Sequence, residues 1–364
     1  MTSEVYQFIL QAAGFDNAAG GDGFDEKFNQ LATGLFTAQF ERNPPYRAIC
    51  QSRQRTPGKV SHWTQIPTVP TAAFKEFDFS CLHKDERTTL FCSSGTTEQR
   101  PSRHFHSEAS LAFYHAALAP WFRRHVLPAN SPEITILSLT PSPIDAPRSS
   151  LAHMLQVVTE RWGRPSSRAL GRLDPQGAWA LEPGEVVDCL NNSITSHEPV
   201  LIAGTAFNFV QLLDWLMARN VRLPLPAGST VMETGGYKGR TRELPKAELH
   251  ASIADRFGVP PGRIVCEYGM CELSSQAYDR RTGDESPDRG FRFPPWARSR
   301  VVSPETGGEV PEGEAGLLQV FDLANAFSVL AIQTEDLAVR RGDGFELIGR
   351  AAAVEPRGCS LLAP

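Results

Sequence analysis

A run of small hydroxyl and basic residues near position 95 carries the first recognisable chemistry of this chain. Its members are Ser93, Ser94, Gly95, Thr96, Thr97, Arg100, Arg103 and His104. Glycine and small side chains let backbone N–H groups approach an anion closely, while hydroxyls and arginines add donors and positive charge. We therefore predict a loop that holds phosphate oxygens, with a solvated surface turn as the alternative. The spacings of a Walker A loop and of a GxGxxG dinucleotide loop are absent from this run.

A second run, residues 267–276, reads Glu-Tyr-Gly-Met-Cys-Glu-Leu-Ser-Ser-Gln. Glu272 lies just past a predicted strand end, where a carboxylate can bind a Mg²⁺ ion that bridges phosphate oxygens. The aromatic ring of Tyr268 can stack on a planar base. These residue types indicate a nucleotide site, and a strand-to-helix turn with a buried tyrosine is the alternative.

Two short motifs further along the chain supply an aspartate and an arginine, residue types that suit binding of a ribose. Asp336 ends the sequence Gln-Thr-Glu-Asp at residues 333–336, and Arg350 follows Gly349. An acidic residue at a strand end can accept hydrogen bonds from the hydroxyls of a ribose. Asp336 therefore predicts a ribose contact, although a single aspartate of this kind also fits a plain turn.

Most of these residues follow segments that are predicted to be strands. Between residues 133 and 267, short apolar segments alternate with helical ones, which predicts a parallel sheet with helices on its faces. The predicted strands are residues 133–139, 199–203, 230–233 and 263–267, and the predicted helices are residues 149–162, 208–219 and 244–257. Ligands bind beyond the carboxyl ends of such strands, so we expect the turns there to gather at one edge. A further helix is expected to begin at Ser107, its N-cap.

Three regions are expected along the chain, and together they predict an α/β fold. Residues 1–60 are expected to form an N-terminal helical segment and residues 61–280 an α/β core. Residues 281–364 are expected to form a β-rich subdomain that ends in a short tail. Apolar positions at helical spacing support the first region, and short apolar pieces between Gly- and Pro-rich turns support the last.

Composition and charge narrow the class of protein. The 364 residues are 41% hydrophobic and 21% charged with a net charge of −5, which is typical of a globular protein and argues against a nucleic-acid partner. No apolar run is long enough for a membrane span, and the N-terminus lacks a basic leader, so we expect a cytoplasmic protein without a membrane partner. Seven cysteines without a CxxC spacing indicate free thiols.

Together and in this order, the motifs resemble those of the adenylate-forming (ANL) superfamily, which includes acyl-CoA synthetases and nonribosomal adenylation domains. Residues 93–97 resemble its Ser/Thr/Gly loop, and residues 268–272 resemble its Tyr-Gly-x-Thr-Glu motif. Residues 334–336 resemble Thr-Gly-Asp, and residues 349–350 match Gly-Arg. The resemblance spans most of the chain and implies the large-domain fold of these enzymes, with parallel sheets flanked by helices.

Within the superfamily the chain looks most like the LuxE-type acyl-protein synthetases, which are related to phenylacetate-CoA ligases. The narrower match is carried by residues 93–97 with His104, and by residues 149–154, 267–276 and 357–361. It implies that a carboxylic acid substrate, typically a fatty acid, is activated with ATP and Mg²⁺ to an acyl-adenylate. The acyl group would then pass to a protein thiol as a thioester, and from there to an acyl reductase or acyl-carrier protein partner.

The resemblance also implies roles for individual residues. The loop at residues 93–97, with Thr96 as a catalytic member, would hold the departing phosphates, and Glu272 would hold Mg²⁺. Asp336 and Arg350 would hold the ribose. The adenine contacts would come from Gly235, Gly236, Tyr268 and Gly269. His153 and Phe207 would line the acyl pocket, although residues of these types on helices also fit a plain core.

Cys359 is the expected acyl-carrying thiol. The neighbouring Arg357 lowers the pKa of a thiol, and a glycine before the cysteine gives the chain end reach. Cys92 and Cys271 flank the predicted site and are its rivals. An inert tail cysteine is the remaining alternative.

The chain departs from the superfamily pattern at three positions. Glu98 stands where the phosphate loop usually has glycine, Cys271 replaces a threonine and Glu335 replaces a glycine. The C-terminal lid of larger relatives, with its catalytic lysine, is expected to be absent. An acyl- or aryl-CoA ligase and a non-catalytic adenylation-fold binding protein are therefore kept as alternative functions. A serine hydrolase is not expected, because no Gly-x-Ser-x-Gly elbow is present.

Overall fold

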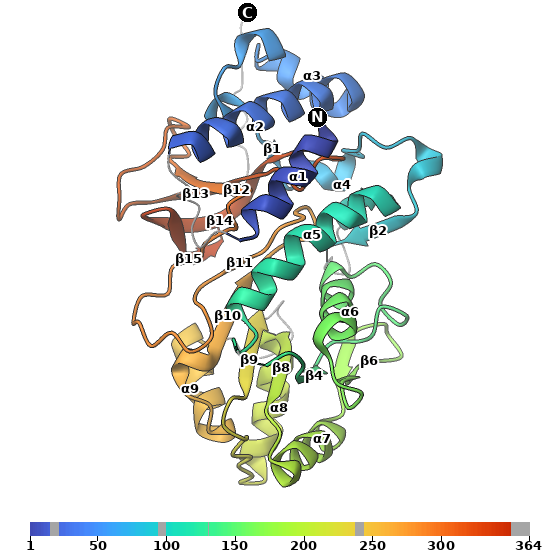
Figure 1. Cartoon of the computed structure of the whole chain (residues 1–364), viewed down its shortest axis with the longest axis vertical. Coiled ribbons are helices and arrows are strands. Elements are labelled where there is room, and N and C mark those ends of the chain that lie inside the picture. The colour runs from blue at the N-terminus through green and yellow to red at the C-terminus, as the bar shows by residue number, and fades with distance from the viewer. Residues whose placement is uncertain (15–21, 94–99, 130, 237–243, 351–364) are drawn as a thin grey trace, which may run out of the picture.

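The computed structural model describes residues 1–14, 22–93, 100–129, 131–236 and 244–350. Two β-sheets form the body of the molecule, and helices cover both of them (Figure 1). The strands of the larger sheet are β4 (Thr135–Ser138), β5 (Arg168–Ala169), β8 (Val200–Thr205), β9 (Thr230–Thr234), β10 (Ile264–Tyr268) and β11 (Ala277–Tyr278). Their order is β11-β10-β9-β8-β4-β5, and only β11 runs antiparallel to its neighbour.

The larger sheet is buried on both faces, which explains why its strands read as continuous apolar runs. All residues of β4, β8, β9 and β10 are buried. The helices on its two faces are α5 (Glu108–His125) and α6 (Ser150–Trp162) on one side, and α7 (Pro183–Ser196), α8 (Ala206–Ala218) and α9 (Lys246–Phe257) on the other. Because side chains alternate across a strand, Ile136 and Leu201 pack with α5 and α6, whereas Leu137 and Ile202 pack with α7 and α8.

The smaller sheet carries the C-terminal motifs and one strand from far upstream. Its strands are β1 (Val69–Pro70), β12 (Ala297–Val302), β13 (Ala315–Asp322), β14 (Ala331–Arg341) and β15 (Gly344–Arg350). β1 pairs in parallel with β14, while β12, β13, β14 and β15 form an antiparallel meander. The sequence did not predict that residues 69–70 join this sheet.

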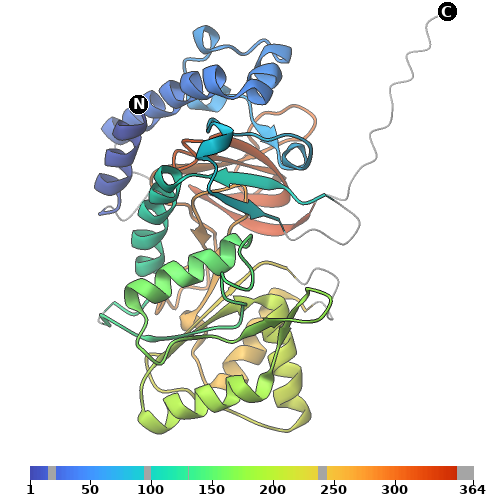
Figure 2. The same ribbon diagram turned by 90° about the vertical axis from the view of Figure 1, so that its right-hand side faces the viewer.

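Three N-terminal helices lie over the smaller sheet (Figure 2). These helices are α1 (Thr2–Ala12), α2 (Asp22–Arg42) and α3 (Pro44–Ser52). Asn43 caps α3 by accepting a hydrogen bond from the Tyr46 backbone N–H at 3.3 Å, and its side chain also donates to the Ser328 carbonyl at 3.3 Å. Tyr46 donates its hydroxyl to the Pro67 carbonyl at 2.9 Å, so this helix end is fixed to the segment that leads into β1.

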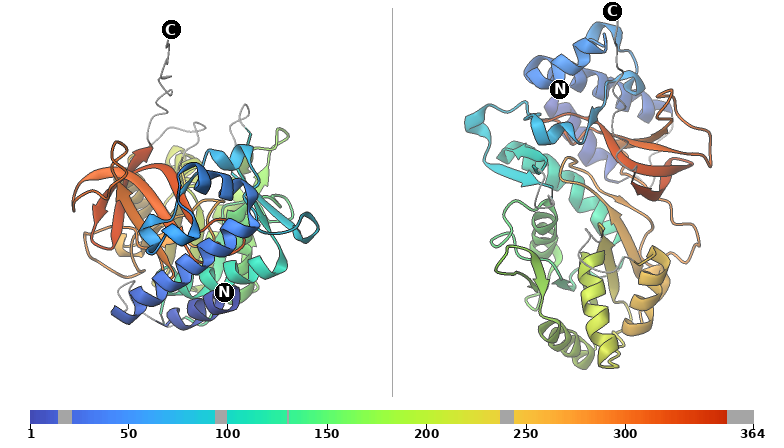
Figure 3. Two further views of the ribbon diagram at one scale, coloured as in Figure 1. Left: turned by 90° about the horizontal axis from the view of Figure 1, so that it is seen from above. Right: turned by 180° about the vertical axis from the view of Figure 1, so that it is seen from behind.

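Short elements complete the described chain. They are α4 (Ala73–Glu76), β2 (Thr89–Cys92), β3 (Arg103–His106), β6 (Gly171–Leu173), β7 (Trp179–Leu181), η1 (Pro57–Lys59), η2 (Trp63–Gln65), η3 (Lys84–Glu86) and η4 (Pro261–Arg263). β2 and β3 form an antiparallel hairpin, as do β6 and β7. The view from behind shows α8 and α9 lying side by side against the larger sheet (Figure 3).

Several predicted elements are confirmed within one or two residues. The four strands predicted between residues 133 and 267 correspond to β4, β8, β9 and β10, and the predicted parallel sheet is present. Ser107 is the N-cap of α5 and accepts a hydrogen bond from the Ser110 backbone N–H at 3.3 Å. Along the part of the chain that the structure describes, no helix is both long and apolar enough to cross a bilayer.

Candidate active site

Tyr268, Asp336 and Arg350 meet where the two sheets join. The Tyr268 hydroxyl donates a hydrogen bond to Asp336 Oδ2 at 2.7 Å, and Arg350 Nε donates to Asp336 Oδ1 at 3.3 Å. Tyr268 ends β10 of the larger sheet, whereas Asp336 and Arg350 are directly paired in the β14–β15 ladder. Asp336 is buried and Arg350 is exposed, so the carboxylate lies behind an accessible guanidinium. Three residues that were predicted from separate motifs therefore contact one another.

The Tyr268 ring lies in an aromatic cluster. Its centroid is 5.9 Å from that of Phe291, 6.2 Å from Phe293 and 5.3 Å from Phe345. Burial, followed by the negative charge of Asp336, raises the pKa of the Tyr268 hydroxyl well above its usual value. The hydroxyl is therefore a permanent donor that orients Asp336. Stacking of this ring on an adenine stays a prediction.

Glu272 lies on a buried turn that follows β10. The Cys271 thiol donates to Glu272 Oε2 at 3.2 Å, and the Glu272 carbonyl accepts a hydrogen bond from Asn325 Nδ2 at 2.8 Å. The described residues contain no group of three or more His, Cys, Asp or Glu side chains that could hold a metal ion. A Mg²⁺ ion is commonly held by one or two carboxylates together with substrate phosphates and water, so the single carboxylate of Glu272 fits that donor set.

The β2–β3 hairpin is fixed to the same turn by a histidine. His104 Nδ1 donates to the Cys271 carbonyl at 2.7 Å. Ser93 closes the end of the hairpin, since its N–H donates to the Ser102 carbonyl at 3.1 Å and its Oγ accepts from the Ser102 N–H at 2.9 Å. The remaining predicted phosphate-loop residues, Ser94, Gly95, Thr96 and Thr97, lie outside the described residues. The structure thus joins β3 of the hairpin that flanks the predicted loop to the Glu272 turn.

Cys92 and Cys271 are the two described alternatives to Cys359 as the acyl-carrying thiol, and burial changes the pKa of both. It raises the pKa of the Cys92 thiol, and it raises the pKa of the Cys271 thiol well above its usual value. The charge of Glu272 is the next contribution at Cys271. Because the thiolate is the nucleophile, both cysteines are poor ones at neutral pH. Cys359 lies outside the described residues.

The predicted adenine-binding glycines occupy the ends of two adjacent strands. Gly235 and Gly236 follow β9 and are exposed, and Gly235 has a φ of +68°, a conformation that favours glycine. Gly269 follows β10 and is also exposed. A Cβ atom at Gly269 would overlap Glu267 Oε1, so a larger residue here would require that carboxylate to move.

Glu267 is a buried carboxylate to which sequence reasoning assigned no role. The Thr234 hydroxyl donates to Glu267 Oε2, which links the ends of β9 and β10. Burial is the main cause that raises the pKa of Glu267 to about 7. The sequence does contain a signal for such a residue, because Glu267 is an acidic residue at the end of a predicted strand that is otherwise mostly apolar.

His153 belongs to a cluster of aromatic rings between α5, α6 and the hairpin. Its Nε2 lies 2.9 Å from His115 Nε2, and the two imidazole rings are stacked with centroids 5.1 Å apart. The Phe91 and Tyr114 rings lie 5.2 and 5.7 Å from the His153 ring. Burial, followed by the charge of His115, lowers the pKa of His153 to about 4, so it is neutral at pH 7. The partner His115 could not be found from sequence, because it lies 38 positions away on another helix.

Phe207 lies in the first turn of α8, directly after the strand end of β8. It is buried and, among the described residues, it belongs to neither of the two hydrophobic cores. Thr205 caps the helix by accepting from the Asn208 N–H at 3.2 Å, which fixes the position of this turn. Its contact with an acyl chain stays a prediction.

Asp322, like Glu267, was assigned no role from the sequence. It joins the site to the smaller sheet. Its carboxylate accepts hydrogen bonds from the backbone N–H groups of Ser274 and Ser275 at 3.0 and 2.8 Å, and from the Ser275 hydroxyl at 2.8 Å. Asp322 ends β13, whereas the two serines follow Glu272. The turn that carries Glu272 is therefore fixed from both sheets.

Comparison with solved structures defines the class of protein. An open conformation of 2-hydroxyisobutyryl-CoA ligase in complex with 2-HIB-AMP and CoA superposes with a TM-score of 0.67 at 15% identity, covering 90% of this chain and 69% of that chain. ATP-bound MatB from Rhodopseudomonas palustris superposes with a TM-score of 0.52 at 17% identity, covering 74% of this chain and 49% of that chain. The fold is that of adenylate-forming ligases, and the predicted fold class is confirmed.

The chain belongs to the LuxE family of acyl-protein synthetases, which matches residues 1–363. Two curated relatives are long-chain-fatty-acid–luciferin-component ligases, one from Vibrio harveyi with 21% identity over 349 residues and one from Aliivibrio fischeri with 20% identity over 352 residues. Each alignment covers 92% of this chain and 86% of the relative. The predicted family and the predicted class of enzyme, an acid-activating ligase that forms an acyl-adenylate, are confirmed.

Proposed function

We propose that this enzyme uses ATP and Mg²⁺ to activate a fatty acid to an acyl-adenylate and then transfers the acyl group to a protein thiol. The observation that carries the proposal is the contact of Tyr268, Asp336 and Arg350 at the junction of the two sheets, with the Glu272 turn next along the chain. Ligands of parallel α/β sheets bind beyond the carboxyl ends of the strands, and Tyr268 ends the parallel strand β10 there. Asp336, expected at a strand end, instead lies within β14 of the smaller sheet and reaches this edge through its contact with Tyr268.

In the first step a carboxylate oxygen of the acid bonds to the α-phosphorus of ATP, and the bond to the bridging oxygen breaks. Pyrophosphate leaves with that electron pair. No general base is needed, because a carboxylic acid is already ionised at neutral pH. Asp336 is suited to hold the ribose, since each carboxylate oxygen keeps a free lone pair after accepting from Tyr268 or Arg350. Arg350 adds a positive charge on the accessible side.

Phosphate binding is assigned to the loop at residues 93–97 and metal binding to Glu272. A bound Mg²⁺ would neutralise phosphate charge. Glu272 is held for this task by the Asn325 amide behind its carbonyl, and the hairpin that carries the loop is held by His104. Positioning of these groups before the reaction is what makes electrostatic stabilisation effective.

In the second step a thiolate sulfur bonds to the acyl carbon, and AMP leaves with the electrons of the phosphate–acyl bond. The raised pKa values of Cys92 and Cys271 speak against these thiols, which supports Cys359 as the acceptor. An acyl reductase or acyl-carrier protein would take the acyl group from this thioester. All six cysteines within the described ranges are free thiols, which supports a reducing, cytoplasmic location.

The first step is tested by acid-dependent ATP–pyrophosphate exchange with a panel of fatty acids. The Asp336→Ala variant is expected to lose exchange by a factor of about 100 or more, because a charged contact made in the transition state is removed. Asp214→Ala, a change at an exposed acid of α8, is the matched control and is expected to keep exchange. Absence of exchange with every acid in the wild-type enzyme would favour a non-catalytic binding protein.

The second step is tested by following labelled acid. Wild-type enzyme is expected to carry a hydroxylamine-labile label, and Cys359→Ala is expected to lose that label while keeping exchange. Label that persists in Cys359→Ala would move the acceptor role to another cysteine. Label that appears on added CoA in place of the protein would support a CoA ligase.

A further inference from the structure

A small cavity lined by three arginines lies between the end of α3, the segment before β1, and strands β12 and β13. We call it the arginine cavity. Its volume is about 220 Å³. Its lining residues are Arg53, Arg55, Thr64, Gln65, Ile66, Pro67, Thr68, Arg300, Gly307 and Gln319. None of these residues belongs to the site proposed for ATP and the acid, so the cavity calls for an explanation of its own.

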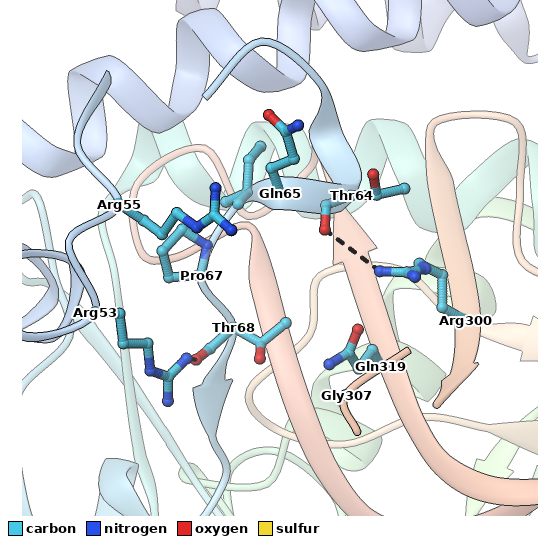
Figure 4. A pocket seen from close by; sticks show the side chains of 10 residues that line it. Arg53, Arg55, Thr64, Gln65, Pro67, Thr68, Arg300, Gly307 and Gln319 are labelled. Atoms are coloured by element: carbon cyan, nitrogen blue, oxygen red, sulfur yellow. Dashed lines mark hydrogen bonds between the residues drawn. The ribbon is translucent and has the colours of Figure 1, made fainter. Parts of the chain in front are cut away.

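The arginines lie on opposite sides of the cavity (Figure 4). Arg53 and Arg55 occupy one side, and Arg300 lies across from them. Arg53 Nη1 donates to the Thr68 carbonyl at 2.8 Å, and Arg300 Nη1 donates to the Thr64 carbonyl at 3.3 Å. Both guanidinium groups are thus oriented by the backbone, and each retains further N–H donors.

The positive charge of the cavity is only partly compensated. Arg300 Nε lies 3.4 Å from Glu309 Oε2, and the other oxygen of this carboxylate, Oε1, lies 3.6 Å from Arg340 Nε. The exposed Arg55 makes no side-chain hydrogen bond or ion pair with any described residue. Among the described residues no acidic side chain lines the cavity, although acidic residues outnumber basic ones in the full sequence, 41 to 36. A neighbouring cavity of about 590 Å³ that also includes Arg300 is different, because acids such as Asp25 and Glu309 line it together with the bases.

Gathering like charges costs Coulomb energy that a bound anion would recover. The planar guanidinium group matches the oxygens of a phosphate and can bind two of them at once. The Thr64, Thr68, Gln65 and Gln319 side chains place neutral polar groups around the same space. A cavity of this volume is below the usual range for drug-sized ligands, which favours a phosphate or diphosphate group over a whole nucleotide.

We propose that the arginine cavity binds a small phosphate-bearing anion at a site separate from the catalytic one. Its wall is connected to the strand that carries Asp336. Gln319 Nε2 donates to Gln333 Oε1 at 2.9 Å, and Gln333 precedes Thr334 and Asp336 on β14. Inorganic phosphate, diphosphate and the phosphate of AMP share the chemistry that the cavity recognises.

The test is calorimetric titration of the full-length enzyme with inorganic phosphate, diphosphate and AMP in turn, at constant ionic strength. At least one of them is expected to bind saturably. Arg55→Ala is expected to weaken this binding about tenfold or more, because a charge-assisted contact is removed. Arg55→Lys is expected to be intermediate, since it keeps the charge and loses the planar fork. These variants should fold normally, because the Arg55 side chain has no described partner and the backbone N–H bond to the Cys50 carbonyl is kept.

Two controls separate this site from others. Arg222→Ala removes an exposed arginine that pairs only with Asp255 among the described residues, and it is expected to leave anion binding unchanged. Asp336→Ala is expected to keep the Arg55-dependent binding even if the catalytic site no longer binds nucleotide. The proposal is overturned if none of the three anions binds at about 10 mM, a concentration that would reveal even weak affinity. It is also overturned if binding survives Arg55→Ala unchanged, or if only an acidic peptide binds.

Discussion

At the scale of single residues, the site depends on buried carboxylates that are oriented by hydrogen bonds from neighbouring strands. Asp336 is the clearest case, because one carboxylate accepts from a tyrosine of β10 and from an arginine of β15. A carboxylate only accepts hydrogen bonds when ionised, so these two donors fix its direction toward the junction of the sheets. In a similar way, the buried carboxylate of Glu267 in β10 accepts a hydrogen bond from the Thr234 hydroxyl at the end of β9.

Tyr268→Phe removes one hydroxyl and keeps the ring among its phenylalanines. We expect the free energy of unfolding to fall by about 1 kcal/mol, the usual net contribution of one hydrogen bond. We also expect a higher KM for ATP, because Asp336 loses the group that orients it. Urea unfolding and ATP–pyrophosphate exchange measure the two effects. An unchanged KM would show that Asp336 does not depend on Tyr268 for its position.

Glu267 makes stability depend on pH. Its pKa of about 7 in the folded protein lies above the ordinary value of 4.5, and burial is the main cause. The stability that it contributes is therefore fully present below pH 4.5 and is lost as the pH rises through 7, by roughly 3 kcal/mol in total. Glu267→Gln, which cannot ionise, is expected to flatten this part of the profile. Identical slopes for wild type and variant between pH 4.5 and 7 would disprove the assignment.

At the scale of elements, the β2–β3 hairpin is joined to the Glu272 turn by the His104 side chain. The hairpin contains only eight strand residues, and an isolated hairpin of this kind has little stability of its own. His104 binds it to the Cys271 carbonyl, one residue before Glu272. The same interaction would keep the phosphate loop at a fixed distance from the metal ligand.

Loss of this anchor is expected to affect both stability and rate. His104→Phe leaves the Cys271 carbonyl without its donor, which costs about 1–3 kcal/mol. Burial lowers the pKa of His104 to about 4, so at pH 7 the native group is neutral and the variant changes no charge. We expect slower adenylation and a milder effect in His104→Gln, which retains an N–H donor. Equal exchange rates in the two variants and the wild type would rule out a positioning role.

At the scale of the whole molecule, the two sheets are joined by buried polar contacts around the Glu272 turn. Asp322 makes three of them, because it accepts from two backbone N–H groups and a hydroxyl of that turn. It also accepts locally from the Ala324 N–H at 2.9 Å. Contacts of this kind fix the position of the Glu272 turn relative to the site residues on the smaller sheet.

Replacing Asp322 tests this connection. In Asp322→Asn one acceptor oxygen becomes a donor that faces the Ser274 and Ser275 N–H groups or the Ser275 hydroxyl. We expect the free energy of unfolding to fall by about 2 kcal/mol or more, because buried donors lose their acceptor. Adenylation should weaken in parallel, since Glu272 shifts with the turn. Stability within about 0.5 kcal/mol of the wild type, the usual range for surface changes, would contradict this role.

Much of the fold follows from local pattern. The apolar strands β4, β8, β9 and β10 and the N-cap at Ser107 were predictable, because burial on both faces and capping leave marks within a few residues. The order of the motifs also predicted the superfamily and the LuxE family. The pairing of β1 with β14 was not predictable, because residues 69–70 are too short to show a strand pattern and their partner lies more than 260 positions away.

The types and the order of the motif residues could be identified from the amino-acid sequence alone, and they were enough to predict the class of enzyme. The folded structure was needed to find the contact of Tyr268 with Asp336, the anchoring of the Glu272 turn by His104 and the pairing of His115 with His153. It was also needed to find that Arg300 shares a cavity with Arg53 and Arg55. The physical reason is that hydrogen bonds and charge interactions depend on distances in space. Local composition sets each element, whereas packing of the two sheets sets which side chains come within reach of one another.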